Sequence, residues 1–212
     1  MQLTSKQEAG LKIAVARYKA GEKYTCISGF AGTGKSTLVK FIVEALNVPS
    51  EDIRYVAYTG KAANVLKNKG CSNAITAHKL LFRAKLMPNG KYSFTPKEVL
   101  EGEPSIIIVD EVSMLPKNLW NLLCSHNVYI IALGDPMQLP PIEKDQNNGI
   151  LEHPHIFLDE VMRQAQESEI IRLSMHVREG KPLYTFPKTD INQEVMIVHP
   201  FEVTDGMMLW AD

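Results

Sequence analysis

The chain has 212 residues, of which 45 % are hydrophobic, enough for one well-filled α/β domain or for a domain with a small insertion. Its N-terminus is polar, and no apolar run approaches the roughly 18 residues that a membrane span needs. We therefore expect a cytoplasmic protein without a secretory signal and without a membrane partner. Three widely spaced cysteines without C-x-x-C spacing argue against a disulfide framework and against a zinc site.

The formal net charge is −1, but the charges are unevenly distributed. Between Lys61 and Leu100 eight basic residues stand against a single acid, Glu98, and the remainder of the chain is acidic. A solvated helix face followed by a loop is the ordinary interpretation of such a basic strip. Its place among the motifs described below favours contact with the phosphates of a nucleic acid instead.

Hydrophobic periodicity predicts strands that alternate with helices. In chain order we expect a helix over residues 4–19, a strand over 24–28, a helix over 35–46, a strand over 53–58, and helices over 61–69 and 77–82. Pro88-Asn89-Gly90 is a turn signal that predicts a protruding hairpin over about residues 83–100. Next we expect a strand over 105–109, a helix over 117–125, strands over 128–133 and 156–158, a helix over 168–178 and a weaker strand over 194–198. This alternation predicts an α/β fold, with a mostly parallel sheet covered on both faces and ligands at the carboxyl ends of its strands.

Residues 29–36 read G-F-A-G-T-G-K-S, the spacing of a phosphate-binding loop placed between a strand and a helix. In such a loop, backbone N–H groups and the positive end of the following helix surround phosphate oxygens. We expect Lys35 to reach the β- and γ-phosphates of ATP and the Ser36 hydroxyl to ligate Mg²⁺. The predicted nucleotide-binding residues of the loop are Gly29, Ala31, Gly32, Thr33, Gly34, Lys35, Ser36 and Thr37.

The predicted strand over residues 105–109 delivers two carboxylates, Asp110 and Glu111, to its carboxyl end. Asp110 suits the metal side of the nucleotide, held through water because Mg²⁺ dehydrates reluctantly. Glu111 can act as general base for an attacking water, although a helix-capping role or an ion pair is the structural alternative. After the next strand, Gln138 can sense the γ-phosphate, since an amide both donates and accepts; the alternative is an ordinary rigid loop.

With these segments in order, the chain resembles the first motor domain of superfamily 1B DNA helicases, in the branch that includes RecD and Dda. The resemblance covers about residues 1–180 and includes, besides the two motifs above, Leu3-Thr4 with Gln7, residues 58–63, 76–78, 134–141 and 158–164. It implies a RecA-like phosphate-loop NTPase fold. It also implies that Gln7 recognises adenine, that Gln138 couples the γ-phosphate to DNA, and that Arg163 is a catalytic arginine finger beside Lys35 and Glu111.

The resemblance further implies that the segments around Thr59, Lys61, Thr76 and His78 hold single-stranded DNA, within the basic strip. The predicted hairpin corresponds to the family's strand-separating pin, and Phe94 is the residue that we expect to stack on a base. The alternative for Phe94 is that it covers the hairpin's own small core. Tyr58 stands where family members usually have proline, so the resemblance does not define the DNA contact at this position.

We expect residues 1–180 to form this motor domain, and residues 181–212 to be a linker or the start of a second motor domain whose motifs are missing from the chain. The predicted function is ATP-dependent 5′ to 3′ DNA unwinding, with weak or no ATPase activity in the lone domain. Two alternatives stay open: a phosphate-loop kinase, which needs a small-molecule acceptor and has no need of Glu111, and a nucleotide-binding interaction domain without turnover. Replication, repair and recombination are not distinguished.

Overall fold

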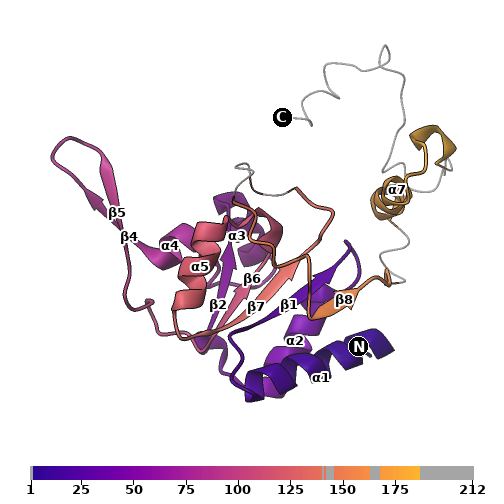
Figure 1. The fold of residues 1–212 in the computed structure, drawn as a ribbon, viewed down its shortest axis with the longest axis horizontal. Coiled ribbons are helices and arrows are strands. Elements are labelled where there is room, and N and C mark those ends of the chain that lie inside the picture. The colour runs from indigo at the N-terminus through magenta and orange to yellow at the C-terminus, as the bar shows by residue number, and fades with distance from the viewer. Residues whose placement is uncertain (1, 140, 142–145, 163–167, 187–212) are drawn as a thin grey trace, which may run out of the picture. The chain divides into compact units, whose positions relative to one another are not determined.

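The computed structural model describes residues 2–139, 141, 146–162 and 168–186 (Figure 1). The chain divides into two compact units, Met1–Glu160 and Val161–Asp212. Each unit is described by itself below. The domain boundary expected near residue 180 stays a prediction.

A six-stranded parallel sheet forms the centre of the first unit. Its strands lie in the order β3-β2-β6-β7-β1-β8, and every neighbouring pair is parallel. This arrangement confirms the predicted α/β fold of the RecA-like class. The bounds of the strands are β1 Tyr24–Gly29, β2 Ile53–Ala57, β3 Ile75–Thr76, β6 Ile106–Val109, β7 Tyr129–Gly134 and β8 Ile156–Leu158.

Alternate residues of the buried strands serve two separate cores, because successive side chains of a strand point to opposite faces. Along β6, Ile107 and Val109 join one hydrophobic cluster, while Ile106 and Ile108 join the other. All four are 1 % exposed or less. A strand buried on both faces reads as a continuous aliphatic run, as residues 106–109 do.

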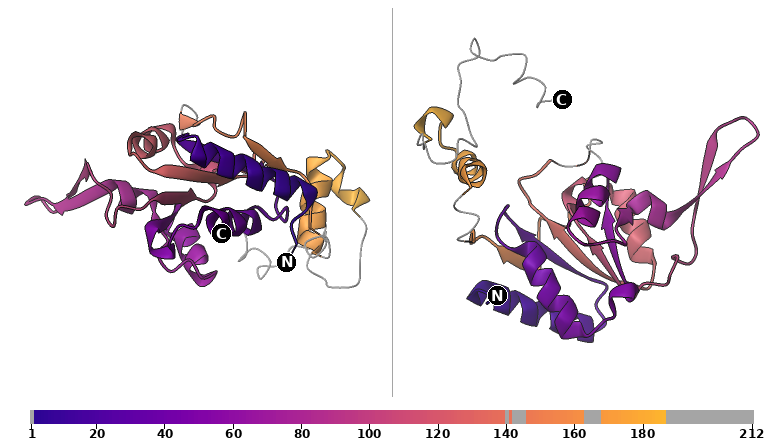
Figure 2. Two further views of the ribbon diagram at one scale, coloured as in Figure 1. Left: turned by 90° about the horizontal axis from the view of Figure 1, so that it is seen from below. Right: turned by 180° about the vertical axis from the view of Figure 1, so that it is seen from behind.

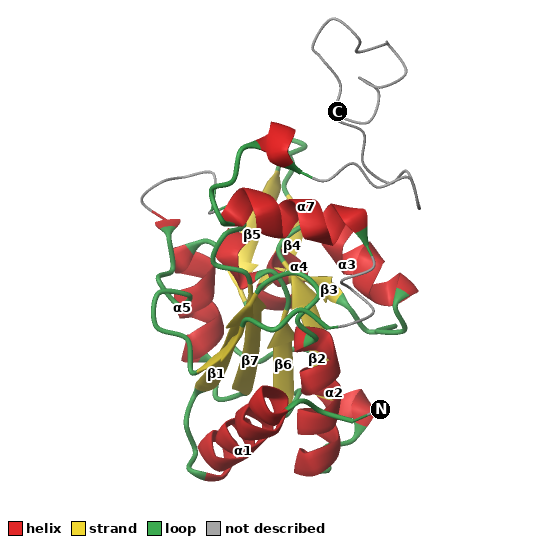
Figure 3. Ribbon diagram, turned by 90° about the vertical axis from the view of Figure 1, so that its right-hand side faces the viewer, coloured by secondary structure: helices red, strands yellow, loops and turns green. Residues whose placement is uncertain are grey.

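The helices of the first unit cover both faces of the sheet. Helices α1 (Ser5–Lys19) and α2 (Lys35–Leu46) pack on the face that includes Ile106 and Ile108, and Figure 3 shows them together beside the strands. Helices α4 (Ala77–Leu81) and α5 (Lys117–Ser125) pack on the opposite face. Helix α3 (Gly60–Asn68) forms a smaller cluster with Ala57 at the end of β2.

An antiparallel hairpin, β4 (Phe82–Leu86) and β5 (Tyr92–Pro96), projects from this body (Figures 1 and 2). It confirms the hairpin predicted from the Pro-Asn-Gly turn, in which Gly90 has a φ of 76°. The register pairs Ala84 with Phe94 and Arg83 with Thr95. One face of the hairpin therefore carries apolar side chains, and the other carries basic and hydroxyl side chains.

In the second unit the structure describes residues 161, 162 and 168–186, with helix α7 (Glu169–Arg178) and a short 3₁₀ turn, η4 (Leu183–Thr185). The Arg172 guanidinium lies 5.7 Å from the centre of the Phe186 ring, and His176 contacts the same ring edge-on. The predicted arginine finger, Arg163, and the predicted strand over 194–198 lie outside the described residues. No helix among the described residues is long and apolar enough to cross a membrane.

Candidate nucleotide-binding site

The phosphate-loop segment forms the turn between strand β1 and helix α2. Gly32 and Gly34 have φ values of 76° and 79°, a left-handed conformation that glycine adopts without steric cost. Gly29 is required for a different reason: a Cβ atom there would lie 2.4 Å from the carbonyl oxygen of Leu158 in the neighbouring strand β8. The loop can therefore close against β8 only with glycine at its first position.

Side chains of the loop hydrogen-bond its own backbone. The Lys35 ammonium donates to the carbonyl oxygens of Gly29 and Phe30 at 2.7 and 2.9 Å. Thr33, which is buried, donates its hydroxyl to the Phe30 carbonyl at 2.8 Å. Helix α2 begins at Lys35; its N-cap residue, Gly34, provides no side-chain cap, and Ser36 in the first turn is exposed. The loop thus presents an ammonium group, a hydroxyl and uncapped backbone N–H groups at one place.

Asp110 and Glu111 follow strand β6 directly, and both are half-buried. The Asp110 carboxylate accepts a hydrogen bond from the Glu111 backbone N–H at 3.0 Å. Glu111 has φ 52° and ψ 47°, a left-handed conformation that is uncommon for a residue with a side chain. The backbone turns at Glu111 into the short 3₁₀ helix η2 (Val112–Met114), so the two carboxylates stand on a sharp bend at the sheet edge.

Strand β7 lies between β1 and β6, so the chain that leaves β7 starts between the phosphate loop and the Asp-Glu pair. Asp135, directly after β7, is 1 % exposed, and its carboxylate accepts from the Met137 N–H at 3.0 Å. The Gln138 N–H donates to the Asp135 carbonyl at 3.1 Å, and the Gln138 side chain is exposed. The structural role of Asp135 was not predicted, although an Asp-Pro pair at a strand end is a turn signal that points to it.

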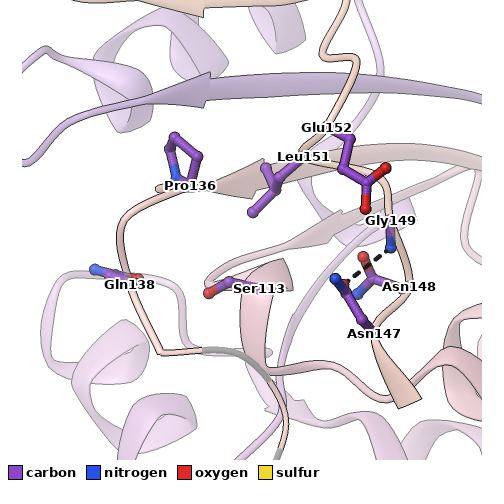
Figure 4. Close-up of a pocket in the computed structure, with 8 residues that line it drawn as sticks. All are labelled: Ser113, Pro136, Gln138, Asn147, Asn148, Gly149, Leu151 and Glu152. Atoms are coloured by element: carbon purple, nitrogen blue, oxygen red, sulfur yellow. Dashed lines mark hydrogen bonds between the residues drawn. The ribbon is translucent and has the colours of Figure 1, made fainter. Parts of the chain in front are cut away.

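Gln138 also lines a pocket of about 230 Å³ together with Ser113 of η2 (Figure 4). The Asn148 side chain on the far wall donates to the carbonyls of Val112 and Leu115 at 2.8 and 2.7 Å, which fixes that wall to η2. Ser113 is 8 % exposed, and its hydroxyl has no hydrogen-bond partner among the described residues. The sequence carries no signal for Ser113, since a serine shortly after an acidic pair is too common to indicate a site.

Gln7 lies against the phosphate loop. It is 1 % exposed. Its side-chain Oε1 accepts from the Thr4 N–H at 3.1 Å, and its side-chain Nε2 donates to the Thr33 carbonyl at 3.3 Å. Thr4 in turn accepts from the Gln7 N–H, so the two residues form a capping box at the start of α1. Gln7 therefore connects α1 to the nucleotide loop, while its recognition of adenine stays a prediction.

The residues expected to contact DNA lie on α3, α4 and the hairpin. The hydroxyls of Thr59 and Thr76 cap α3 and α4, accepting from backbone N–H groups at 3.2 Å in both cases. Lys61 and His78 are exposed at the starts of these helices, and Phe94 on β5 is 60 % exposed. Because β2 and β3 are adjacent and parallel, their carboxyl ends bring α3 and α4 to one edge of the sheet.

The side chains present suit ATP and Mg²⁺. Oxygen donors on Ser36 and Asp110 are the ligand type that Mg²⁺ prefers, and the metal usually takes few protein ligands beside phosphates and water. The left-handed glycines and the uncapped start of α2 form the backbone cradle that a triphosphate requires.

The fold and this site together define a phosphate-loop NTPase of the RecA-like class. The family described as AAA domain matches residues 2–199, and the chain belongs to that family. The solved structure of the Pif1 helicase from Candida albicans shares the fold, with a TM-score of 0.55 and 24 % identity over 86 % of this chain and 45 % of that one.

Two curated relatives are helicases. The chain is 32 % identical to the ATP-dependent DNA helicase dda of Enterobacteria phage T4 over 84 % of this chain and 43 % of that protein. It is 30 % identical to the ATP-dependent RecD2 DNA helicase of Deinococcus radiodurans over 76 % of this chain and 22 % of that protein. These relatives confirm the resemblance to RecD- and Dda-like helicases. The chain spans less than half of the length of either.

Proposed function

We propose that this chain is the N-terminal motor domain of an ATP-dependent DNA helicase, which couples ATP hydrolysis to 5′ to 3′ movement along single-stranded DNA. In this proposal a second motor domain, on the remainder of a longer protein, completes the helicase. ATP and Mg²⁺ are its cofactors, and no small-molecule phosphate acceptor is involved. The cytoplasmic location and the pathway, whether replication, repair or recombination, stay predictions from the sequence and the family.

The nucleotide end of the mechanism follows from the loop and the sheet edge. Lys35 exchanges its hydrogen bonds to the Gly29 and Phe30 carbonyls for the β- and γ-phosphate oxygens of ATP. Ser36 and, through water, Asp110 would hold Mg²⁺, which would supply charge neutralisation at the triphosphate. Glu111 takes the proton from the attacking water, since its carboxylate stands beside Asp110 on the same bend. Gln7 reads the adenine, and Arg163 stabilises charge on the transferring phosphoryl group.

The DNA end of the mechanism lies on the same sheet edge. Lys61, at the start of α3, neutralises a phosphate of the strand, and His78 and Phe94 contact its bases. Thr59 and Thr76 act indirectly: their hydroxyls fix the first turns of α3 and α4, which then face the single-stranded DNA.

One observation carries the proposal: β7 lies between β1 and β6, so the segment with Gln138 leaves the sheet between the phosphate loop and the Asp110-Glu111 pair. From this position Gln138 can contact the γ-phosphate of ATP. Its loop can then carry the change on hydrolysis to the DNA-binding surface. A kinase has no need of a sensor between these strands, and an inert nucleotide-binding domain has no need of Glu111.

The test is ATP turnover by the full-length protein, with and without a single-stranded oligonucleotide. We expect turnover to rise on addition of DNA, and Glu111→Gln to lower it at least 100-fold while ATP binding persists, because the general base is lost and the loop is kept. The matched control is Glu51→Gln, an exposed glutamate before β2 at the opposite edge of the sheet, which should leave turnover unchanged.

Three results contradict the proposal. Turnover that DNA does not stimulate removes the helicase assignment, and phosphate delivered to a small acceptor supports a kinase instead. Nucleotide binding without turnover in the full-length protein supports an interaction domain.

A further inference from the structure

Five aromatic side chains follow one another from the end of β2 to the outer part of the hairpin; we refer to them as the aromatic track. The first three are in ring contact: the His78 ring centre lies 6.0 Å from that of Tyr58 and 6.0 Å from that of Phe82, and the His78 and Phe82 rings are stacked. The last two, Tyr92 and Phe94, have ring centres 6.5 Å apart. The track is Tyr58, His78, Phe82, Phe94 and Tyr92.

The hairpin register joins the two parts of the track. Phe82 and Ala84 lie on the same face of β4, and Ala84 pairs directly with Phe94, so Phe82 and Phe94 are diagonal neighbours on that face. A recess of about 680 Å³ at the base of the hairpin is lined by His78, Phe82 and Phe94 together. The rings of α4 and of the hairpin therefore share one continuous surface.

The outer part of the track is exposed. Phe94 and Tyr92 are 60 % and 64 % exposed, so the alternative that Phe94 covers a small hairpin core does not account for its position. The inner part is anchored: Tyr58 and Phe82 are half-buried and pack against the core cluster under α4 and α5. Fixed inner rings and open outer rings are the arrangement expected of a preformed binding surface.

Cationic groups line the same recess. Lys79 and Arg83 are exposed on its wall. Lys97 donates to the Lys79 carbonyl at 2.9 Å and lies 3.7 Å from Glu101, so it ties the end of β5 to α4. Planar rings rimmed by free cations fit an unpaired polynucleotide, whose bases stack and whose phosphates are anionic.

We propose that the aromatic track stacks consecutive bases of the single strand, with Tyr58 and Phe82 as binding residues beside His78, Phe94 and Tyr92. This inference rests on the proposed function and adds how the strand is held. Thr59 and Thr76 use their hydroxyls as helix caps, so the rings are the groups that this edge of the sheet presents to the bases. Tyr58 adds a ring where the family usually has proline, so base stacking here is a property of this chain.

The test measures how tightly the 212-residue protein binds two fluorescent oligonucleotides of equal length. One is single-stranded DNA of mixed sequence, and the other is the same oligonucleotide with abasic sites in place of its bases. We expect at least about tenfold tighter binding of the base-bearing probe, because stacking contributes about 1–3 kcal/mol per base. Phe94→Leu and Tyr58→Leu, which keep apolar bulk, should each lower affinity for that probe about fivefold or more and leave the abasic probe unchanged. The salt dependence of binding should not change, since no phosphate contact is removed.

Phe157→Leu is the matched control, because Phe157 is an exposed ring on β8 outside the track. It should leave both affinities unchanged. Equal wild-type affinity for the two probes overturns the inference and leaves the proposed function intact. Variants that weaken both probes equally also overturn it, because the rings then act only by shaping the surface. A wild-type chain that binds neither probe removes the inference and the proposed DNA contact together.

Discussion

Glu111, the predicted general base, has a strained backbone conformation. Its left-handed conformation, at φ 52°, costs a residue with a Cβ atom about 1–2 kcal/mol relative to the right-handed region. The bend that causes this strain directs the Glu111 backbone N–H to the Asp110 carboxylate. Strain at such a place persists only because the surrounding strands fix it, and it is typical of functional sites.

Replacing Glu111 with glycine should therefore separate stability from activity. We expect Glu111→Gly to raise the free energy of unfolding by about 1 kcal/mol, because glycine adopts this conformation without steric cost. Turnover by the full-length protein should be lost with the carboxylate. Urea unfolding checks the first expectation, through a higher midpoint at an unchanged slope.

Glu103 is the matched control for this change. It also has a positive φ, 38°, but lies in the loop before β6 and belongs to no predicted site. Glu103→Gly should raise stability in the same direction and leave turnover unchanged. A Glu111→Gly protein no more stable than wild type would show that the bend is not strained.

At the scale of elements, the hairpin stands apart from the domain that carries it. A two-stranded ribbon is marginally stable by itself. The core clusters of the first unit include no residue between Arg83 and Val99, and only Phe82 packs against them at the base. The energy that holds the sheet domain together therefore lies outside the hairpin, which is free to serve binding.

Excision of residues 84–94, with a Gly-Gly closure, should leave the sheet domain folded. We expect the midpoint of thermal unfolding to change by less than about 2 °C, because no buried apolar area is lost. Affinity for single-stranded DNA should fall, since the exposed rings leave with the hairpin. Removing a shorter surface segment of the same unit, residues 70–73, should by contrast destabilise the domain, because Asn73 hydrogen-bonds the Ile53 carbonyl. A large loss of stability on hairpin excision would contradict the separation.

Local patterns predicted most of these elements because each rests on near neighbours in the chain. Helix α5 and strand β8 have the predicted bounds, and the hairpin turn lies where Pro88-Asn89-Gly90 indicates. Strand β3 was missed: it has two residues, Ile75 and Thr76, and exists through pairing with β2, which a local pattern does not encode. A strand predicted to reach Tyr58 ends at Ala57, because Thr59 already caps the next helix.

The candidate site divides in the same way. The loop glycines, Lys35 and the Asp-Glu pair follow from spacing alone, and the structure brings both motifs to the carboxyl edge of one sheet. The engaged amide of Gln7 and the ring contacts of Tyr58 with His78 depend on residues far apart in sequence. No local pattern contains such contacts, so only the folded chain could reveal them.

At the scale of the whole molecule, burial of ionisable groups sets how stability depends on pH. Burial raises the pKa of the Cys26 thiol to about 12, from an ordinary value of 9.0. Burial likewise raises the pKa of the Tyr129 phenol, partly offset by its hydrogen bond with Thr25. In both cases the folded protein holds a proton that the unfolded chain releases at lower pH.

Because these pKa values are higher in the folded protein than in the unfolded chain, we expect the protein to lose stability in alkali. Stability from the buried Cys26 thiol is fully present below pH 9 and is lost as pH rises towards 12, because only the unfolded chain ionises in that window. We expect the free energy of unfolding to fall by about 1.4 kcal/mol per pH unit from this thiol alone. Urea unfolding between pH 8 and 10.5 measures this slope.

The Cys26→Ala variant should be less stable than the wild type at pH 8, because the substitution leaves a core cavity, but its stability should fall less steeply with pH. Val109→Ala, in the same core cluster, removes apolar volume without removing a titrating group, so its curve should run parallel to that of the wild type. Parallel curves for Cys26→Ala and wild type would instead assign the alkaline loss to Tyr129 and other groups.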